Sequence, residues 1–394
     1  MSTIVTYHVR SNQWRRGNYV APPEADRTDE LNALIAATPD GTEGNRNTVT
    51  LPDERWRVDG KIVVTNRNHL NITSSGTFTI WTEFTGVELG IVTQQGASNR
   101  SHWTLTSCED VHLSNMQIDG PYENRRYGPD PRFAAYNEAT AFEHGYSVQG
   151  ASQECSVQNC SFYNIGGDGL YVGGTGEYNQ NITLKNCTGA FPGRQSLGIV
   201  LVDNLLVEDV NIQWGGRSGL DIEPNHDSHF VHNATFRRCD IGSQFYPFIV
   251  GGEPPLRGGE TKPGILNKRE NILIEDCIGR NAASSHTAIL ANRTGINLTV
   301  RNHTDLRQRS KYGVTLAGWE GPVIIENSII TSGPATPTTY GVWVKNCTGT
   351  VDITGNTFNG VTGDGGADEL MLVEGGSPVI TSSGNEWSMG TQTD

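Results

Sequence analysis

The stretch from Ile165 to Glu223 decides the fold, because three segments within it begin alike. They read Asp168-Gly169-Leu170-Tyr171-Val172, Leu197-Gly198-Ile199-Val200-Leu201 and Ser218-Gly219-Leu220-Asp221-Ile222. In each segment a glycine is followed by apolar side chains at alternate positions, the pattern of a short half-buried strand. Gly313 and Gly341 begin similar segments further along the chain. A strand that recurs at intervals of roughly 20 to 40 residues predicts a solenoid.

A second strand recurs in the same phase and often ends in Asn-Cys or Asp-Cys. Examples are Cys155–Cys160, Ile182–Cys187, Leu206–Val210, Phe236–Cys239 and Ile272–Cys277. Two or three such strands per turn, separated by Asn, Asp and Gly, predict an all-β parallel β-helix. A leucine-rich repeat is excluded, since it requires a regular leucine frame and helical or 3₁₀ segments.

The composition fits this fold and limits the partners. Only 18% of the 394 residues are charged, and the 47 glycines suit many tight turns. The net charge of −14 argues against nucleic acid and against insertion at an anionic membrane surface. Five of the seven cysteines end the second strand, so we expect a ladder of buried thiols there rather than disulfides or zinc ligands; these are Cys160, Cys187, Cys239, Cys277 and Cys347.

The chain divides into an N-terminal arm or linker, residues 1–24, and a β-helix domain, residues 25–394. Residues 26–37 are expected to form a helix that caps the first turn of the solenoid, with Asp26 or Thr28 at its start. The first 20 residues lack the apolar segment of a secretory signal, and no segment resembles a membrane span. We therefore expect a virion or an extracellular protein that leaves the cell by another route.

The order of motifs near the N-terminus resembles the opening of pectate-lyase-like proteins. It comprises Asp26-x-Thr28-Asp29-x-Leu31-Asn32-x-Leu34-Ile35, then Val49-x-Leu51-Pro52, then Trp56-x-Val58-Asp59-Gly60 and the repeat. More narrowly, it is similar to the single-stranded right-handed β-helices of bacteriophage tailspikes and minor tail proteins. The resemblance implies a right-handed parallel β-helix with a capping helix, a homotrimer, and binding or cleavage of surface glycans.

Two carboxylates share the outer face of the third strand quoted above. Because alternate residues of a strand share a face, Leu220 and Ile222 are expected inside, and Asp221 and Glu223 outside, with bases roughly 6–7 Å apart. Glycoside hydrolysis uses two carboxyl groups about 5–5.5 Å or 6.5–9.5 Å apart. Asp168 lies at the start of a rung two positions away, and strand spacing puts that rung at roughly 10 Å from the rung of Asp221 and Glu223. Asp221, Glu223 and Asp168 are the predicted catalytic residues, unless these carboxylates only face solvent, pair with arginine or form a turn.

Other side chains near the same rungs are predicted to bind substrate, namely Arg217, Arg194, Tyr171, His226, Trp214 and, from an insertion, Arg257. Two segments, 119–142 and 243–264, interrupt the repeat and are rich in Tyr, Phe, Arg, Gly and Pro. We expect loops there that contact sugar rings, with a subunit contact as the alternative. No ligand spacing marks a metal site, and no cofactor is expected.

Three functions remain open. The first is a phage tail protein that binds, and in its enzymatic form hydrolyses, a bacterial cell-envelope polysaccharide, with Glu223 as general acid and Asp221 as base or nucleophile. The second is a structural or adhesin tail subunit without chemistry, and the third is a secreted polysaccharide lyase or hydrolase. Other tail proteins are possible partners of residues 1–24. Motifs of polygalacturonases and pectate lyases, such as Arg-x-Pro-x-x-Arg, are absent.

Overall fold

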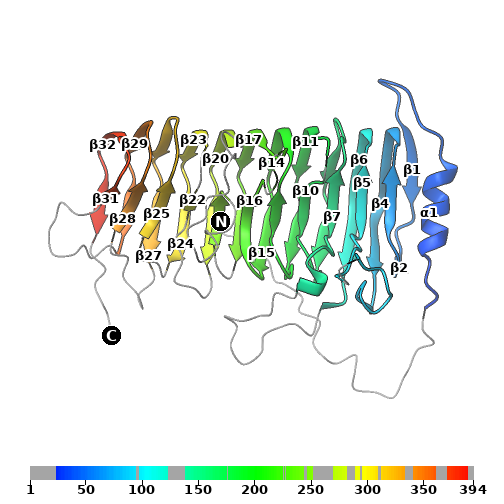
Figure 1. Ribbon diagram of the computed structural model, residues 1–394. Coiled ribbons are helices and arrows are strands. Elements are labelled where there is room, and N and C mark those ends of the chain that lie inside the picture. The colour runs from blue at the N-terminus through cyan, green and yellow to red at the C-terminus, as the bar shows by residue number, and fades with distance from the viewer. Residues whose placement is uncertain are drawn as a thin grey trace, which may run out of the picture.

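The computed structural model describes residues 24–94, 97–122, 138–174, 176–224, 226, 228–243, 246–251, 269–281, 289–292, 295–308, 312–332, 340–360 and 371–388. They form one elongated solenoid of parallel strands, with a helix at the N-terminal end (Figure 1). The predicted parallel β-helix and its capping helix are confirmed.

The described strands form two sheets, one of 11 strands, here sheet A, and one of 22 strands, here sheet B. Sheet A receives one strand from each turn of the solenoid: β3 (Ile62–Thr65), β5 (Trp103–Thr106), β7 (Tyr146–Gln149), β10 (Leu170–Gly173), β13 (Leu197–Ile199), β16 (Ser218–Ile222), β19 (Tyr246–Val250), β22 (Ile289–Asn292), β25 (Tyr312–Ala317), β28 (Tyr340–Lys345) and β31 (Met371–Glu374).

Sheet B receives two strands from most turns. The first of each pair is β1 (Asn47–Leu51), β4 (Asn68–Trp81), β6 (Glu109–Asp119), β8 (Ser156–Gln158), β11 (Asn179–Lys185), β14 (Val202–Glu208), β17 (Val231–Arg237), β20 (Arg269–Glu275), β23 (Ile296–Arg301), β26 (Val323–Glu326), β29 (Thr350–Thr354) or β32 (Val379–Ser383). The second is β2 (Arg55–Arg57), β9 (Ser161–Tyr163), β12 (Thr188–Ala190), β15 (Asn211–Gly215), β18 (Asp240–Ser243), β21 (Ile278–Asn281), β24 (Thr304–Gln308), β27 (Ile329–Ser332), β30 (Thr357–Asn359) or β33 (Glu386–Ser388). The long strands β4 and β6 pair with both members.

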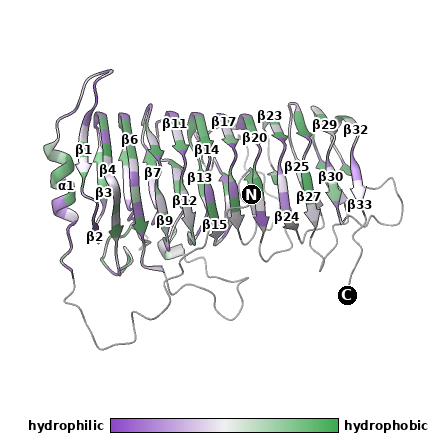
Figure 2. Cartoon of the chain, turned by 180° about the vertical axis from the view of Figure 1, so that it is seen from behind, coloured by the Kyte–Doolittle hydropathy of each residue, from purple (hydrophilic) through white to green (hydrophobic). Residues whose placement is uncertain are grey.

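The core is a set of apolar columns inside the solenoid. Leu170, Leu197 and Leu220 lie side by side on β10, β13 and β16, and all three are fully buried. Green apolar positions recur along the strands from end to end (Figure 2). This register corrects the alignment of the three repeat segments quoted above. The residue equivalent to Gly169 and Gly219 is Ser196, not Gly198. A slip of two residues keeps the same side chains inside, so alternation alone does not reveal it.

The Asn-Cys pattern marks the corner between the two strands of sheet B. The residue before each cysteine there, such as Asn159, Asn186 or Asp276, has a positive φ of 51° to 53°, which Asn and Asp tolerate better than most residues. The next side chain then turns inward, and all seven cysteines are free and buried. Cys347 was wrongly placed in this ladder, because it follows β28 of sheet A.

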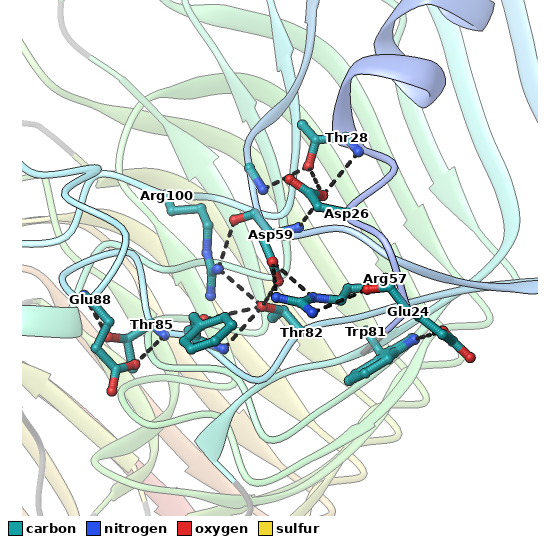
Figure 3. A network of polar contacts seen from close by, with 12 residues as sticks. Glu24, Asp26, Thr28, Arg57, Asp59, Trp81, Thr82, Thr85, Glu88 and Arg100 are labelled. Carbon is teal, nitrogen blue, oxygen red and sulfur yellow. Dashed lines mark hydrogen bonds and ion pairs between the residues drawn. The ribbon is translucent and has the colours of Figure 1, made fainter. Parts of the chain in front are cut away.

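The helix α1 (Thr28–Ala37) closes the N-terminal end by burying Leu31 and Ile35 against the core. It begins two residues later than predicted, and Arg27 occupies the position before its first turn. Asp26 lies outside the helix and its Oδ1 accepts from the Thr28 N–H at 3.0 Å and the Asp59 N–H at 3.0 Å (Figure 3). Thr28 Oγ1 accepts from the Gly60 N–H at 2.8 Å. A Cβ at Gly60 would lie 2.6 Å from Thr28 Cγ2, so a glycine is required there.

A buried ion pair supports the turn beneath the cap. Arg100 Nη2 lies 3.2 Å from Glu143 Oε2, with both side chains fully buried, and Arg100 Nη1 donates to the Asp59 carbonyl at 3.0 Å. Tyr122 Oη also donates to Glu143 Oε2 at 2.9 Å. A 3₁₀ turn, Glu138–Thr140, precedes this region.

One of the two predicted insertions is wrong in part. Tyr246 and Phe248 belong to β19, in register with Ser218 and Leu220 of β16, and Phe248 is fully buried in the core. Most of the remainder, including Arg257, lies outside the described residues.

Candidate active site

The site lies on the outer face of sheet A, where β10, β13 and β16 run side by side. Tyr171, Gly198 and Asp221 occupy one row across these strands. Gly198 has no side chain, and a Cβ there would lie 2.4 Å from Asp168 Oδ2. The middle rung therefore leaves space in which groups from the two flanking rungs approach each other.

The residues just before β13 connect the carboxylates. Arg194 donates from Nη1 to Asp168 Oδ2 at 3.1 Å and from Nη2 to Glu223 Oε2 at 3.0 Å. The backbone N–H of Gln195 donates to Asp168 Oδ1 at 3.1 Å, and its side-chain Nε2 donates to Asp221 Oδ2. Asp221 Oδ1 is buried, with no hydrogen-bond partner among the described residues. All three predicted catalytic carboxylates thus belong to one cluster.

A histidine and a tyrosine flank Asp168. The His144 and Tyr171 rings stack with centroids 4.4 Å apart and planes at 6°. His144 Nδ1 accepts from the Asp168 N–H at 3.1 Å. Burial, with the charge of Arg194, lowers the pKa of His144 to about 3, so the ring is neutral and its 3.4 Å approach to Asp168 Oδ2 is not an ion pair. Burial likewise raises the pKa of the Tyr171 phenol to about 12.

The carboxylates have unequal environments. Burial, and then the charge of Glu223, raises the pKa of Asp221 well above its usual value, despite the opposing charges of Arg194 and Arg217. Burial also raises the pKa of Asp168, against the opposing effects of Arg194 and the Gln195 N–H. Asp221 and Asp168 are 1% and 0% exposed, whereas Glu223 is 7% exposed. The site therefore pairs a buried Asp221, whose raised pKa favours the protonated form, with a Glu223 that is ion-paired with Arg194.

The other predicted residues lie around this cluster. Arg217 precedes β16, and its backbone N–H donates to the Arg194 carbonyl at 2.8 Å. Trp214 is 43% exposed on β15, before the same strand. His226 is exposed and follows β16, and the centroids of the His226 and His229 rings lie 4.6 Å apart.

The immediate neighbours of the carboxylates differ from expectation. Alternation along the neighbouring segments predicts that Val202 and Val250 also lie beside Asp221 and Glu223. Val202 instead belongs to β14 of sheet B, and Val250 pairs with Ile222 and faces the core. The residues that flank Asp221 are Gly198 and Ile249. The two-residue slip in the alignment of the segments caused the error at Val202, whereas Val250 is one residue out of the row of Asp221.

Sequence reasoning also missed His144 and Gln195. Both precede a strand, where the alternation of strand residues gives no side-chain direction. Their signal is the correct repeat alignment, which puts His144, Asp168, Gln195 and Ser218 in one column, each two residues before the first inward residue of its strand. Within the described residues, no group of three His, Cys, Asp or Glu side chains has an arrangement that could hold a metal ion.

The family model of the right handed beta helix region matches residues 143–358. The chain belongs to this family. Its match contains every residue of the cluster. No curated protein matches the chain in sequence. No helix among the described residues is long and apolar enough to span a membrane.

Solved structures show the same fold at low sequence identity. The A-module of a mannuronan C-5 epimerase from Azotobacter vinelandii is 14% identical, with a TM-score of 0.56, over 93% of this chain and 96% of the module. The catalytic domain of a GH87 α-1,3-glucanase, in complex with nigerose, is 14% identical with a TM-score of 0.51, over 93% and 68%. ORF18 of Geobacillus virus E2 is 12% identical with a TM-score of 0.48, over 91% of this chain and 58% of the viral protein.

Proposed function

We propose that this protein binds a bacterial cell-envelope glycan on the outer face of sheet A and hydrolyses it at Asp221 and Glu223. The observation that carries the proposal is a pair of carboxyl groups at one strand end, in which Asp221 is buried against Gln195 and Glu223 is ion-paired with Arg194. Pairs of carboxyl groups whose environments separate their pKa values are the arrangement that glycoside hydrolysis requires.

The roles follow from the different environments of the two groups. Asp221 is the general acid, because burial raises its pKa and its Oδ1 has no hydrogen-bond partner among the residues that the structure describes. It donates this proton to the glycosidic oxygen as the bond to the sugar carbon breaks. Glu223 either attacks that carbon or takes a proton from the attacking water, depending on the separation of the two carboxyl groups. This assignment reverses the roles expected from the sequence.

Arg194, Gln195 and Asp168 position these two groups. Arg194 holds Glu223 Oε2 and is itself held by Asp168, while Gln195 fixes Asp221 Oδ2. Asp168 and Glu223 are both ion-paired with Arg194. In a protein of net charge −14, a neutral sugar is favoured over a dense polyanion at the point of cleavage.

Binding residues lie at both ends of β16. Trp214 and Arg217 precede the strand, and Glu223 and His226 follow it. A glycan that contacts both ends runs along the strand direction, across the solenoid.

Association with a phage tail and assembly as a homotrimer are also part of the proposal. They are supported by the N-terminal motif that resembles tailspikes, in which Asp26 and Thr28 dock the cap onto Asp59 and Gly60. Tail proteins are the proposed partners of residues 1–24, and the virion is the proposed location.

A second candidate is glycan binding without cleavage. The near-complete burial of Asp221 and Asp168 favours it, because a substrate must reach an acid in order to be protonated by it. On this alternative the carboxylates only fix Arg194 and the surrounding turns.

The test is release of reducing ends from envelope polysaccharides by the wild-type protein, Asp221→Asn and Glu223→Gln. We expect each variant to lose about 10²–10⁴-fold in rate while it still binds the glycan. Binding by all three proteins with no cleavage by the wild type would establish the second candidate. A product that absorbs as an unsaturated sugar would instead indicate a lyase.

A further inference from the structure

The turns that leave sheet A at the candidate site differ in length. Only Val200 and Leu201 separate β13 from β14, whereas residues 174–178 separate β10 from β11 and residues 223–230 separate β16 from β17. The middle rung therefore has the shortest of the three turns, and Leu201 within it is fully buried.

Aromatic side chains from the two longer turns contact each other beside this short turn. Tyr178 and Phe230 have ring centroids 5.2 Å apart at 50°, and Phe230 and His232 have centroids 4.5 Å apart at 34°. Tyr178 is 44% exposed, and Phe230 and His232 are half-buried. These three residues are called the aromatic platform below. Tyr178 precedes β11 and Phe230 precedes β17, and these two strands do not pair with each other because β14 lies between them. The short turn before β14 leaves room for the two rings to touch.

The platform is close to the carboxylate cluster. The Glu223 N–H donates to the Ile199 carbonyl at 2.8 Å, and the Val202 N–H donates to the Phe230 carbonyl at 2.9 Å. Because Ile199 and Val202 are three residues apart, the backbones of Glu223 and Phe230 are separated by only about 10 Å. A short oligosaccharide can span this distance.

The surroundings of the platform suit a sugar. Ring faces bind the apolar C–H face of a pyranose, while polar groups at the rim bind its hydroxyls. Asp203 lies beside His232 in the register of β14 and β17, and its Oδ1 accepts from Asn233 Nδ2 at 2.8 Å. Apolar faces and hydrogen-bonding groups thus occur together on the edge that continues from Glu223.

We propose that the platform of Tyr178, Phe230 and His232 is a sugar-stacking subsite for a glycan residue beyond the point of cleavage. The proposal rests on the proposed function and extends it: the ligand is an oligosaccharide that leaves the carboxylate cluster at Glu223 and crosses the turn into sheet B. An aromatic cluster that only covers Leu201 is the alternative.

Binding of oligosaccharides of increasing length, prepared by partial acid hydrolysis of an envelope polysaccharide that the protein binds, tests the subsite. The measurement uses Asp221→Asn protein, so cleavage does not interfere. Tyr178→Ala and Phe230→Ala should each weaken binding of the longer oligosaccharides by about tenfold, the scale of losing one aromatic anchor. The shortest ligands, which do not reach the platform, should bind unchanged.

Three controls isolate the effect. Tyr178→Phe should retain binding, since it keeps the ring. Phe84→Ala removes an aromatic side chain of similar exposure, 37%, near the N-terminal cap and should leave binding unchanged. Thermal melting identifies any variant that fails to fold. If Phe230→Ala fails to fold, the conservative variant Phe230→Tyr replaces it in the test and must retain binding of the longer oligosaccharides.

The outcomes separate the two proposals. If longer oligosaccharides bind the Tyr178→Ala and Phe230→Ala variants as tightly as the parent protein, the subsite is wrong and the carboxylate site is unaffected. If the wild-type protein binds no envelope polysaccharide, both the proposed function and the subsite fall.

Discussion

Each outer face has an arginine held between two carboxylates. On sheet B, nitrogens of Arg237 lie 3.5 Å from Glu208 Oε1 and 2.9 Å from Glu275 Oε2. On sheet A, nitrogens of Arg194 lie 3.1 Å from Asp168 Oδ2 and 3.0 Å from Glu223 Oε2. The two arrangements follow the same local rule, an arginine on one rung bonded to carboxylates on the rungs beside it. They differ in exposure: the Arg237 side chain is 37% exposed and the Arg194 side chain 14%.

They differ also in charge balance. On sheet B a cation and an anion alternate rung by rung, in a row that contains Lys185, Glu208, Arg237, Glu275, Arg301 and Glu326. On sheet A a third carboxylate, Asp221, faces the neutral amide of Gln195 instead of a cation. Hydrogen bonds from Lys185 and Arg238 lower the pKa of Glu208, while burial raises that of Asp221. A row of alternating charges stabilises the register of a sheet, whereas a buried carboxyl that faces a neutral amide has a raised pKa.

Replacement of the two arginines should give the largest difference between the faces. Arg194→Met leaves Asp168 and Glu223 buried without their cation, so we expect a loss of about 3–5 kcal/mol in the free energy of unfolding. Arg237→Met at the exposed position should cost about 0–1 kcal/mol. Denaturant unfolding of the two variants measures both values. Equal losses would show that burial does not distinguish the two faces.

A side chain at Gly198 should have the next largest effect. The Cβ of Gly198→Ala would lie 2.4 Å from Asp168 Oδ2, so we expect a loss of about 1–3 kcal/mol from overpacking. Asp168→Ala removes the opposing atoms. The cost of Gly198→Ala should therefore be smaller in the Asp168→Ala background, and a double-mutant cycle measures the difference. Additive losses would mean that the space at Gly198 does not serve Asp168.

The pH dependence of stability should have opposite signs on the two faces. The folded-state pKa of Asp221 is raised, so its contribution is most favourable at low pH and declines as pH rises through that value. The melting temperature of Asp221→Asn should therefore increase relative to wild type as pH rises. The folded-state pKa of Glu208 is lowered, so its contribution is present at neutral pH and is lost on acidification. Glu208→Gln should be less stable than wild type at neutral pH and equal to it in strong acid. Melting curves at several pH values test both, and slopes of the same sign would contradict the comparison.

The sequence predicts the inside of the solenoid better than its outer faces. Alternation along β16 puts Leu220 and Ile222 inside and Asp221 outside because a strand has a period of two, and the structure agrees. Strands of three residues, such as β9 and β12, are too short for a period to be visible, so the third strand of each turn remained uncertain. Pro247 and its aromatic neighbours suggested a loop, although that segment forms β19.

The sequence predicted several residues of the candidate site, but not the contacts between them. Asp221 and Glu223 follow from alternation, and Asp168 from the repeat. The side chains that determine their chemistry, Arg194 and Gln195, lie in the turn before β13, and only the register of three neighbouring rungs brings them between the carboxylates. The burial of the cluster was not predictable, since outward residues of a β-helix were expected to face solvent.

The smallest effect should come from one anion of the alternating row on sheet B. Glu275→Gln removes the partner of Arg237 and Arg301, and we expect a loss of at most about 1 kcal/mol, since ion pairs with exposed cations contribute little. Added salt should reduce this loss further, because it screens charges that are in contact with solvent. Glu223→Gln, whose side chain is 10% exposed beside Arg194, provides the matched case: its effect on stability should change little with salt. Denaturant unfolding at low and high ionic strength measures both. A salt dependence at Glu223 as large as that at Glu275 would mean that the carboxylate cluster is open to water, in which case burial no longer explains the raised pKa of Asp221.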